Sequence, residues 1–173
     1  CIRDRYKSRK RNHDAIHALE TSDDMADALC AALPKDARVI RIHVSGDMFS
    51  HQYFMAWTKV AKRNPEVLFY AYTKSLTYWV RSRDIVPTNL VLTASYGGRN
   101  DHLIAEHGLR SAKVVFSRQQ AADLGLEIDN DDSHACDPTK ANQDFALLIH
   151  GVQPKGSEAA SALKILKKEE VTA

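Results

Sequence analysis

The sequence predicts an α/β fold with a mostly parallel sheet of five to six strands, arranged as a partial or incomplete (β/α) barrel. Short runs rich in β-branched residues recur along the chain, and each is followed by a segment in which apolar residues have helical spacing. The strand-like runs are almost continuously apolar, which is typical of parallel strands covered on both faces. No low-complexity tract interrupts this alternation, so residues 1–173 are expected to form a single α/β domain.

The first half of the chain begins with helical spacing over His13–Leu33, where the sequence TSDD is expected to separate two helices and to supply Thr21 or Ser22 as an N-cap. A strand is predicted over Arg38–Gly46. The following helix begins at the N-cap Ser50 and stops at Asn64 and Pro65. The next strand covers Val67–Thr73.

The second half repeats this βα pattern. A short helix is predicted over Ser75–Val86, and Gly108 is expected to cap another short helix. The remaining predicted segments are a strand over Asn89–Tyr96, a helix over Asp101–Gly108, a strand over Ala112–Arg118, helical turns over Gln119–Gly125, a strand over Asp144–Gly151 and a helix over Ser157–Glu170 with Ser157 as N-cap. Residues from about Ile128 to Gln143 read as a polar surface loop, with a metal clip at His134 and Cys136 as the weaker alternative.

Composition indicates a soluble globular protein, because 44% of the residues are hydrophobic and 27% are charged. Three widely separated cysteines argue against a disulfide framework and favour a reducing cytoplasm. No apolar run approaches the roughly 18–20 residues that span a membrane. The chain begins with Cys1 rather than Met, so residues 1–13 are expected to be a basic N-terminal segment truncated upstream.

Polar and charged residues gather where the predicted strands end. Ligands of parallel α/β folds bind outside the carboxyl ends of the strands, so these residues are expected to form one site for a small polar or anionic ligand. In this hypothesis Asp47 accepts from an amine or hydroxyl, and Lys74 and Arg118 meet carboxylate or phosphate. Catalytic roles in proton transfer fall to His43, Asp47 and His150. The other predicted ligand-binding residues are Ser45, Gly46, Ser95 and Gln153.

The P-loop motif G-x-x-x-x-G-K-[ST] does not occur, so a P-loop NTPase is not indicated. The nucleophile-elbow motif G-x-S-x-G is also absent, which argues against a Ser–His–Asp hydrolase. The net charge of +2 implies no strong overall field. Residues 1–13 nevertheless hold six Lys/Arg against one Asp, a pattern of either a solvated helix start or a phosphate-binding arm.

Two stretches resemble the gene-product-88 family of actinobacteriophage proteins: RIHVSGDMFSHQYFMAWTKVAKRNPEVLFYAYTKSL and FALLIHGVQPKGSEAASALKIL. The resemblance extends from about Arg38 to the C-terminal helix and implies a protein of the host-cell cytoplasm. Members of that family resemble, more distantly, radical S-adenosylmethionine enzymes. Those enzymes are partial (β/α) barrels with an iron–sulfur cluster, and a Gly-Gly-Glu-type turn after their second strand receives the amino group of S-adenosylmethionine.

This resemblance assigns Ser45-Gly46-Asp47 to the position of that turn and Cys1 to the position of the last cluster cysteine. It implies S-adenosylmethionine and an iron–sulfur cluster as cofactors. A cluster of this class needs three neighbouring cysteines, whereas the chain has one at that place, so a truncated or a degenerate enzyme is expected.

The competing hypothesis is a non-enzymatic phage accessory protein that binds a host protein or nucleic acid. Its binding residues would be Arg3, Arg5, Arg9 and Arg11 of the basic segment, together with the cations at the strand ends.

Overall fold

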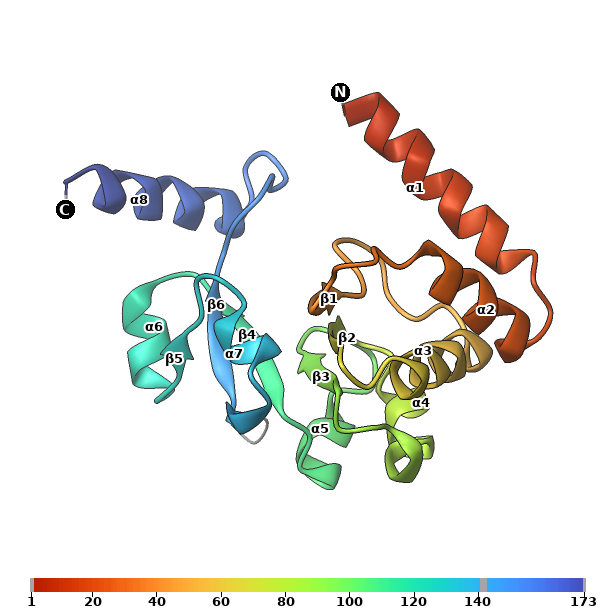
Figure 1. The fold of residues 1–173 in the computed structure, drawn as a ribbon. Helices are drawn as coiled ribbons and strands as arrows, with labels where there is room; N and C mark the ends of the chain where they lie inside the picture. Colours follow the sequence, from red (N-terminus) through yellow and green to blue (C-terminus); the bar gives the residue numbers. More distant parts are fainter. Residues whose placement is uncertain (1, 141–142, 173) are drawn as a thin grey trace.

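The computed structural model describes residues 2–140 and 143–172, with the side chains of residues 7–137, 139–140 and 143–168. It confirms the predicted fold class, because six strands in the described part of the chain form one all-parallel sheet in the order β1-β2-β3-β4-β6-β5 (Figure 1). The sheet is not closed: the outermost described strands, β1 and β5, each pair with one neighbour. An open parallel sheet of this order is compatible with a partial barrel.

The strands are β1 (Val39–Arg41), β2 (Leu68–Thr73), β3 (Leu90–Ser95), β4 (Ser111–Val115), β5 (Glu127–Ile128) and β6 (Phe145–Leu148). The helices are α1 (Ile2–His17), α2 (Ser22–Ala32), α3 (His51–Arg63), α4 (Leu76–Arg81), α5 (His102–His107), α6 (Arg118–Asp123), α7 (Ser133–Cys136) and α8 (Glu158–Thr172). Two short 3₁₀ helices are η1 (Arg83–Ile85) and η2 (Pro138–Lys140). No helix in the described part of the chain is both long and apolar enough to cross a membrane.

Helix ends are set by the local signals that the sequence contains. The hydroxyls of Thr21, Ser50 and Ser157 each accept a hydrogen bond from the backbone N–H three residues later, at 3.1 Å in all three cases. Gly108 ends α5 in the left-handed conformation, with φ of 56°. These four predicted caps are confirmed.

The two faces of the sheet bury different residues because side chains alternate along each strand. On the outer face, Phe69 and Ala71 of β2 pack with α2 and α3, where Phe54 and Val60 are almost completely buried. Further along the outer face, smaller clusters pack against α4, α5 and α6. On the inner face, Tyr70, Val91, Ala112 and Phe145 form a second core with Ala135 of α7. The short helix α7 therefore covers the inner face.

The polar segment after β5 is not the surface loop that its composition suggests. His134 and Ala135 are 7% and 1% exposed, and α7 packs against β2 and β3. Buried Asp129 holds the turn by accepting hydrogen bonds from the backbone N–H groups of Asp131 and His134, at 3.2 and 3.1 Å. Buried Arg110 donates to the carbonyl oxygens of His134 and Ala135. Internal hydrogen bonds thus bury part of this segment, around Asp129 and His134, although its other acids stay at the surface.

The first predicted strand is also much shorter than expected, since Arg38–Gly46 yields only the three residues of β1. The backbone N–H of Ile42 still donates to Tyr70 at 2.9 Å, and the chain then leaves the sheet. Gly46 bends the following loop with φ of 90°, a conformation that other residues rarely adopt. The loop 43–50 consequently lies between β1 and α3 instead of extending the strand.

Asn89 fixes the start of β3 against the end of α3. Its side-chain amide lies 2.9, 3.0 and 2.9 Å from the carbonyl oxygens of Ala61, Asn64 and Val67. These carbonyls lie at a helix end and in the turn that follows; those of Ala61 and Asn64 also accept from the backbone N–H groups of Asn64 and Val67, at 3.2 and 3.1 Å. A single amide group therefore holds the α3–β2 connection in place.

Candidate functional site: two cavities at the strand ends

The predicted site residues divide between two cavities. Ser95 and His150 line a cavity of about 710 Å³ next to α8, which we call the α8 cavity. His43, Ser45, Gly46 and Asp47 line a cavity of about 380 Å³ next to α1, which we call the α1 cavity. Lys74, Arg118 and Gln153 line neither of them. The predicted residues therefore do not line one common cavity, and their roles toward a ligand remain predictions.

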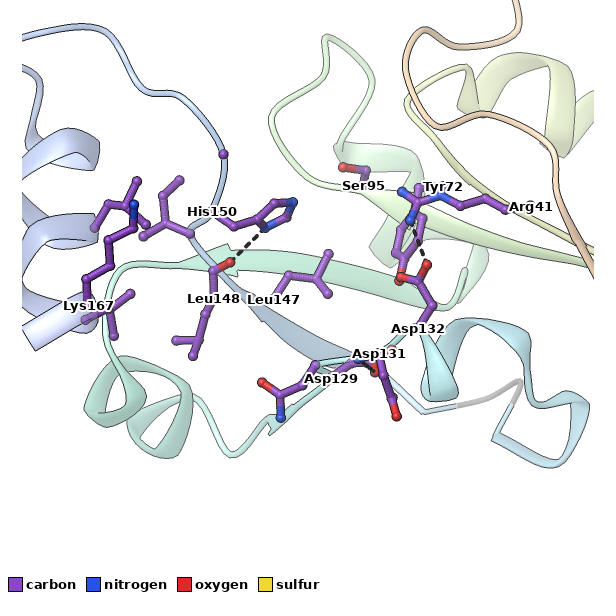
Figure 2. Close-up of a pocket in the computed structure, with 15 residues that line it drawn as sticks. Arg41, Tyr72, Ser95, Asp129, Asp131, Asp132, Leu147, Leu148, His150 and Lys167 are labelled. Atoms are coloured by element: carbon purple, nitrogen blue, oxygen red, sulfur yellow. Dashed lines mark hydrogen bonds and ion pairs between the residues drawn. The ribbon is translucent and has the colours of Figure 1, made fainter. Parts of the chain in front are cut away.

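The α8 cavity is built from strand ends of the inner face, the loop after β5, the end of β6 and α8 (Figure 2). Figure 2 shows the Arg41, Tyr72 and Asp132 side chains together at one end, Lys167 of α8 at the other, and His150 between them. Its lining residues are Arg41, Tyr72, Ser95, Asp129, Asn130, Asp131, Asp132, Leu147, Leu148, Ile149, His150, Gly151, Leu163, Leu166 and Lys167.

Asp132 joins the loop after β5 to the two strands at the far side of the sheet. Its carboxylate lies 2.6 Å from the Arg41 guanidinium and accepts hydrogen bonds from the hydroxyls of Tyr70 and Tyr72, at 3.0 and 2.9 Å. The Arg41 guanidinium also lies 5.1 Å from the centre of the Tyr72 ring, a cation–π distance. We refer to Asp132, Arg41, Tyr70 and Tyr72 as the Asp132 cluster.

Burial, followed by the hydrogen bond to Asp132, raises the pKa of Tyr70 to about 12. The same two causes raise the pKa of Tyr72. Both phenols therefore stay protonated and donate to the carboxylate at neutral pH. Asp132 has a left-handed backbone, with φ of 64°, which is uncommon for a residue other than glycine. The cluster holds this backbone in place.

His150 lies between the two ends of the α8 cavity and presents its imidazole to a ligand. His150 is exposed, and its Nδ1 lies 3.0 Å from the carbonyl oxygen of Leu148. A carbonyl oxygen can only accept, so Nδ1 carries a hydrogen, and in the neutral imidazole Nε2 is then an acceptor. Gln153 donates to the backbone carbonyl of His150 at 2.6 Å, so it shapes the loop that carries the imidazole.

Charges of both signs line this cavity. Hydrogen bonds from Ser133 lower the pKa of Asp131, which keeps its exposed carboxylate ionised. Lys167 supplies an exposed ammonium group from α8. A small molecule that carries both a cation and an anion could pair with both groups.

Asp47 and Lys74 connect neighbouring loops. The Asp47 carboxylate accepts from the Thr73 hydroxyl and from the backbone N–H of Lys74, both at 2.6 Å, and from the N–H of Met48 at 2.7 Å. The Lys74 ammonium donates to the Ser95 hydroxyl at 2.8 Å and to the carbonyl oxygens of Ser95 and Tyr96. Asp47 and Lys74 together connect the loops that follow β1, β2 and β3. Their roles toward a ligand remain predictions.

His43 lies in the wall of the α1 cavity rather than beside His150. Its Nε2 is 3.2 Å from the Tyr53 hydroxyl, and its Nδ1 is buried without a hydrogen-bond partner. Burial lowers the pKa of this histidine, so the neutral imidazole dominates at neutral pH. The predicted catalytic histidines His43 and His150 are consequently in different cavities.

The predicted metal residue, Cys1, lies outside the described residues, as do the side chains of Arg3 and Arg5. Cys30 packs against the outer-face core and Cys136 against the inner-face core. Within the described ranges, no group of three His, Cys, Asp or Glu residues is arranged to hold a metal ion. Arg118 begins α6 and is exposed.

Sequence reasoning missed the Asp132 cluster and Lys167. A usable signal was present in FYAYT, because residues two apart in a strand share a face and Tyr70 and Tyr72 therefore point the same way. Nothing in the sequence indicates that an acid sixty residues later reaches both hydroxyls. That contact depends on the sheet order, in which β5 lies outside β6.

These features define an open, all-parallel α/β protein with cavities next to its N- and C-terminal helices. A family model described as "Gene product 88" matches residues 3–168, and the chain belongs to this family. It is 46% identical over 43 residues to the "Gene 88 protein" of Mycobacterium phage L5, an alignment that covers 25% of this chain and 18% of that protein's length. No solved structure matches the chain.

Proposed function

We propose that this chain binds a small charged organic molecule in the α8 cavity, and that the ligand is of the S-adenosylmethionine type. The observation that carries the proposal is the convergence of separate strand ends, two loops and α8 on one cavity of about 710 Å³. Sites in parallel α/β proteins lie at this end of the strands. The size is within the range of small-molecule sites.

The charges of the cavity support a ligand with groups of both signs. S-adenosylmethionine carries an ammonium, a carboxylate and a sulfonium. In the proposed complex the ionised Asp131 faces a cationic group, and Lys167 meets the carboxylate. His150 offers an acceptor nitrogen for an amine or a hydroxyl. Asp132 is already occupied by three partners and serves as cavity wall.

An iron–sulfur cluster does not fit the residues that the structure describes. A cluster of the radical class needs at least three thiolates close together, and Cys30 and Cys136 belong to cores on different faces of the sheet. The proposed function is therefore the binding of the ligand, without a reaction at an iron–sulfur cluster.

Isothermal titration calorimetry with S-adenosylmethionine tests the proposal. The double variant His150→Ala/Lys167→Ala should weaken binding by at least about tenfold, equivalent to about 1.4 kcal/mol. The matched control Lys155→Ala/Lys164→Ala removes exposed cations outside the cavity and should bind like the parent chain. Absence of binding heat would overturn the ligand class. Equal affinity in the parent chain and the cavity variant would overturn the site.

A further inference from the structure

The N-terminal helix α1 is almost entirely exposed. Every described side chain from Lys7 to Ala15 is exposed, and Ile16 is the helical residue that packs against the outer-face core. Figure 1 shows α1 extending away from the sheet, with its C-terminal end against the body of the protein. A helix that is polar on all sides gains little from packing, so its surface is available for a partner.

One face of α1 forms a wall of the α1 cavity. Asn12 and His13 lie three and four residues after Arg9, and Ile16 lies four and three residues after them, so all four share one helix face that lines the cavity. The loop from Ile42 to Asp47 and the aromatic residues Phe49, Tyr53 and Trp57 also line the cavity.

Aromatic rings surround this cavity. Phe49 stacks on Tyr53 with a centroid distance of 4.4 Å, and His13 and His17 contact Phe49 at 5.4 and 5.1 Å. Tyr53 in turn meets Trp57 edge-on at 6.3 Å. Such a set of π faces and edges suits a planar heteroaromatic group.

Two buried polar atoms of the cavity residues have no hydrogen-bond partner: Nδ1 of His43 and Nε1 of Trp57, a residue that is 6% exposed. Burial raises the pKa of Tyr53, and an interaction with Trp57 opposes that rise. Unpartnered buried polar groups cost about 1–3 kcal/mol each. Both atoms lie below the cavity surface, so recognition of a base rests on the aromatic rings of the lining.

The charge of α1 favours an anionic partner. Lys7, Arg9 and Arg11 are exposed and take part in no ion pair among the described residues. The one acid among the residues that line the α1 cavity is Asp47, whose carboxylate already accepts three hydrogen bonds. Arg9 lines the cavity and also belongs to the basic helix. It therefore connects the cavity to the exposed cations Lys7 and Arg11, which could bind phosphates.

We propose that α1 and the α1 cavity form a binding surface for single-stranded nucleic acid, with one base in the cavity and the adjacent phosphates along Lys7, Arg9 and Arg11. A single strand is favoured because its bases are unstacked and can enter a cavity lined by aromatic rings. This surface is distinct from the α8 cavity, so the proposal does not depend on S-adenosylmethionine binding.

Fluorescence anisotropy with a labelled thymidine oligonucleotide of about 12 nucleotides tests the surface. Three neutralised phosphates predict a slope of log affinity against log salt of about −2, which is roughly a 20-fold loss between 50 and 200 mM salt. In the variant Arg9→Ala/Arg11→Ala one phosphate contact remains, so the slope should become shallower, about −0.7. Lys155→Ala/Lys164→Ala, which removes the same charge from outside this surface, should leave the slope unchanged.

The fluorescence of Trp57 tests whether a base enters the α1 cavity. The chain has two tryptophans, so in the variant Trp79→Phe the emission comes from Trp57 alone. The oligonucleotide should quench it, and a duplex of equal length should not. The proposal is overturned if no oligonucleotide binds or if both charge variants weaken binding equally. It is also overturned if the duplex quenches as well as the single strand, or if thymidine monophosphate binds as tightly as the oligonucleotide.

Discussion

Replacing Asp132 with alanine removes the carboxylate that joins the loop after β5 to β1 and β2. Three contacts disappear together: the 2.6 Å ion pair with Arg41 and the two hydrogen bonds from Tyr70 and Tyr72. The methyl group that replaces the carboxylate can accept none of them. Because the same residue has a positive φ, alanine also keeps the backbone strain without the contacts that offset it.

The expected loss in the free energy of unfolding is about 3 kcal/mol. Hydrogen bonds from a neutral donor to a charged acceptor contribute about 1.5–3 kcal/mol each, and the lower value applies because the Asp132 side chain is 24% exposed. The ion pair adds less than about 1 kcal/mol because the Arg41 side chain is 35% exposed.

Urea unfolding followed by tryptophan fluorescence measures this loss. Asp132→Asn keeps an acceptor and tolerates the left-handed backbone, so it should lose about half as much as alanine. Asp132→Gly loses every contact but relieves the strain, and should be about 0.5–1 kcal/mol more stable than the alanine variant. An alanine variant within about 0.5 kcal/mol of the parent chain would refute the role of the carboxylate. A glycine variant more stable than the parent would show that strain dominates.

Asp47→Ala should lower the free energy of unfolding by about 2–4 kcal/mol, measured by urea unfolding, because three donors lose their acceptor; an unchanged midpoint would contradict its linking role. Asn89→Asp should lower the melting temperature more than Asn89→Ala does, because it places a carboxylate against three carbonyl oxygens. Folding lowers the pKa of His43, so its contribution to stability is present above the ordinary value of 6.5 and is lost as the pH falls through the folded value. An NMR titration that places this imidazole at or above 6.5 would disprove its burial. Folding raises the pKa of Tyr70 to about 12, so stability should hold below pH 10 and fall between about pH 10 and 12. Tyr70→Phe should remove part of that alkaline loss, and an identical pH profile would contradict the shift.

Much of the fold was predictable from local patterns. Five of the six strands coincide with apolar runs, and the caps at Thr21, Ser50 and Ser157 follow from side chains that reach only three residues along the chain. The missed strand, β5, has two residues, which is too short for any periodicity. The helix α7 has four residues in a segment rich in acids. Its burial depends on Asp129, five residues before His134, and on Arg110, a partner from β3–β4 that local composition does not reveal.

The site was predicted less completely, because the sequence indicates which residues end a strand but not where the loops then go. Parallel pairing implied that His43 and His150 would share one edge of the sheet. The early end of β1 instead places His43 against α3 and Tyr53, whereas His150 follows β6 toward α8. Asp132 was unpredictable for the opposite reason, since its three partners come from strands at the other side of the sheet.

The exposure of α1 has a consequence for amide hydrogen exchange. The side chains of Lys7–Ala15 are all exposed, so opening this helical segment exposes little new apolar surface. Its amides should exchange by local fraying, orders of magnitude faster than those of β2 and β3, most of whose side chains are buried. The basic helix and the parallel sheet are thus separate cooperative units, joined where Ile16 meets the core.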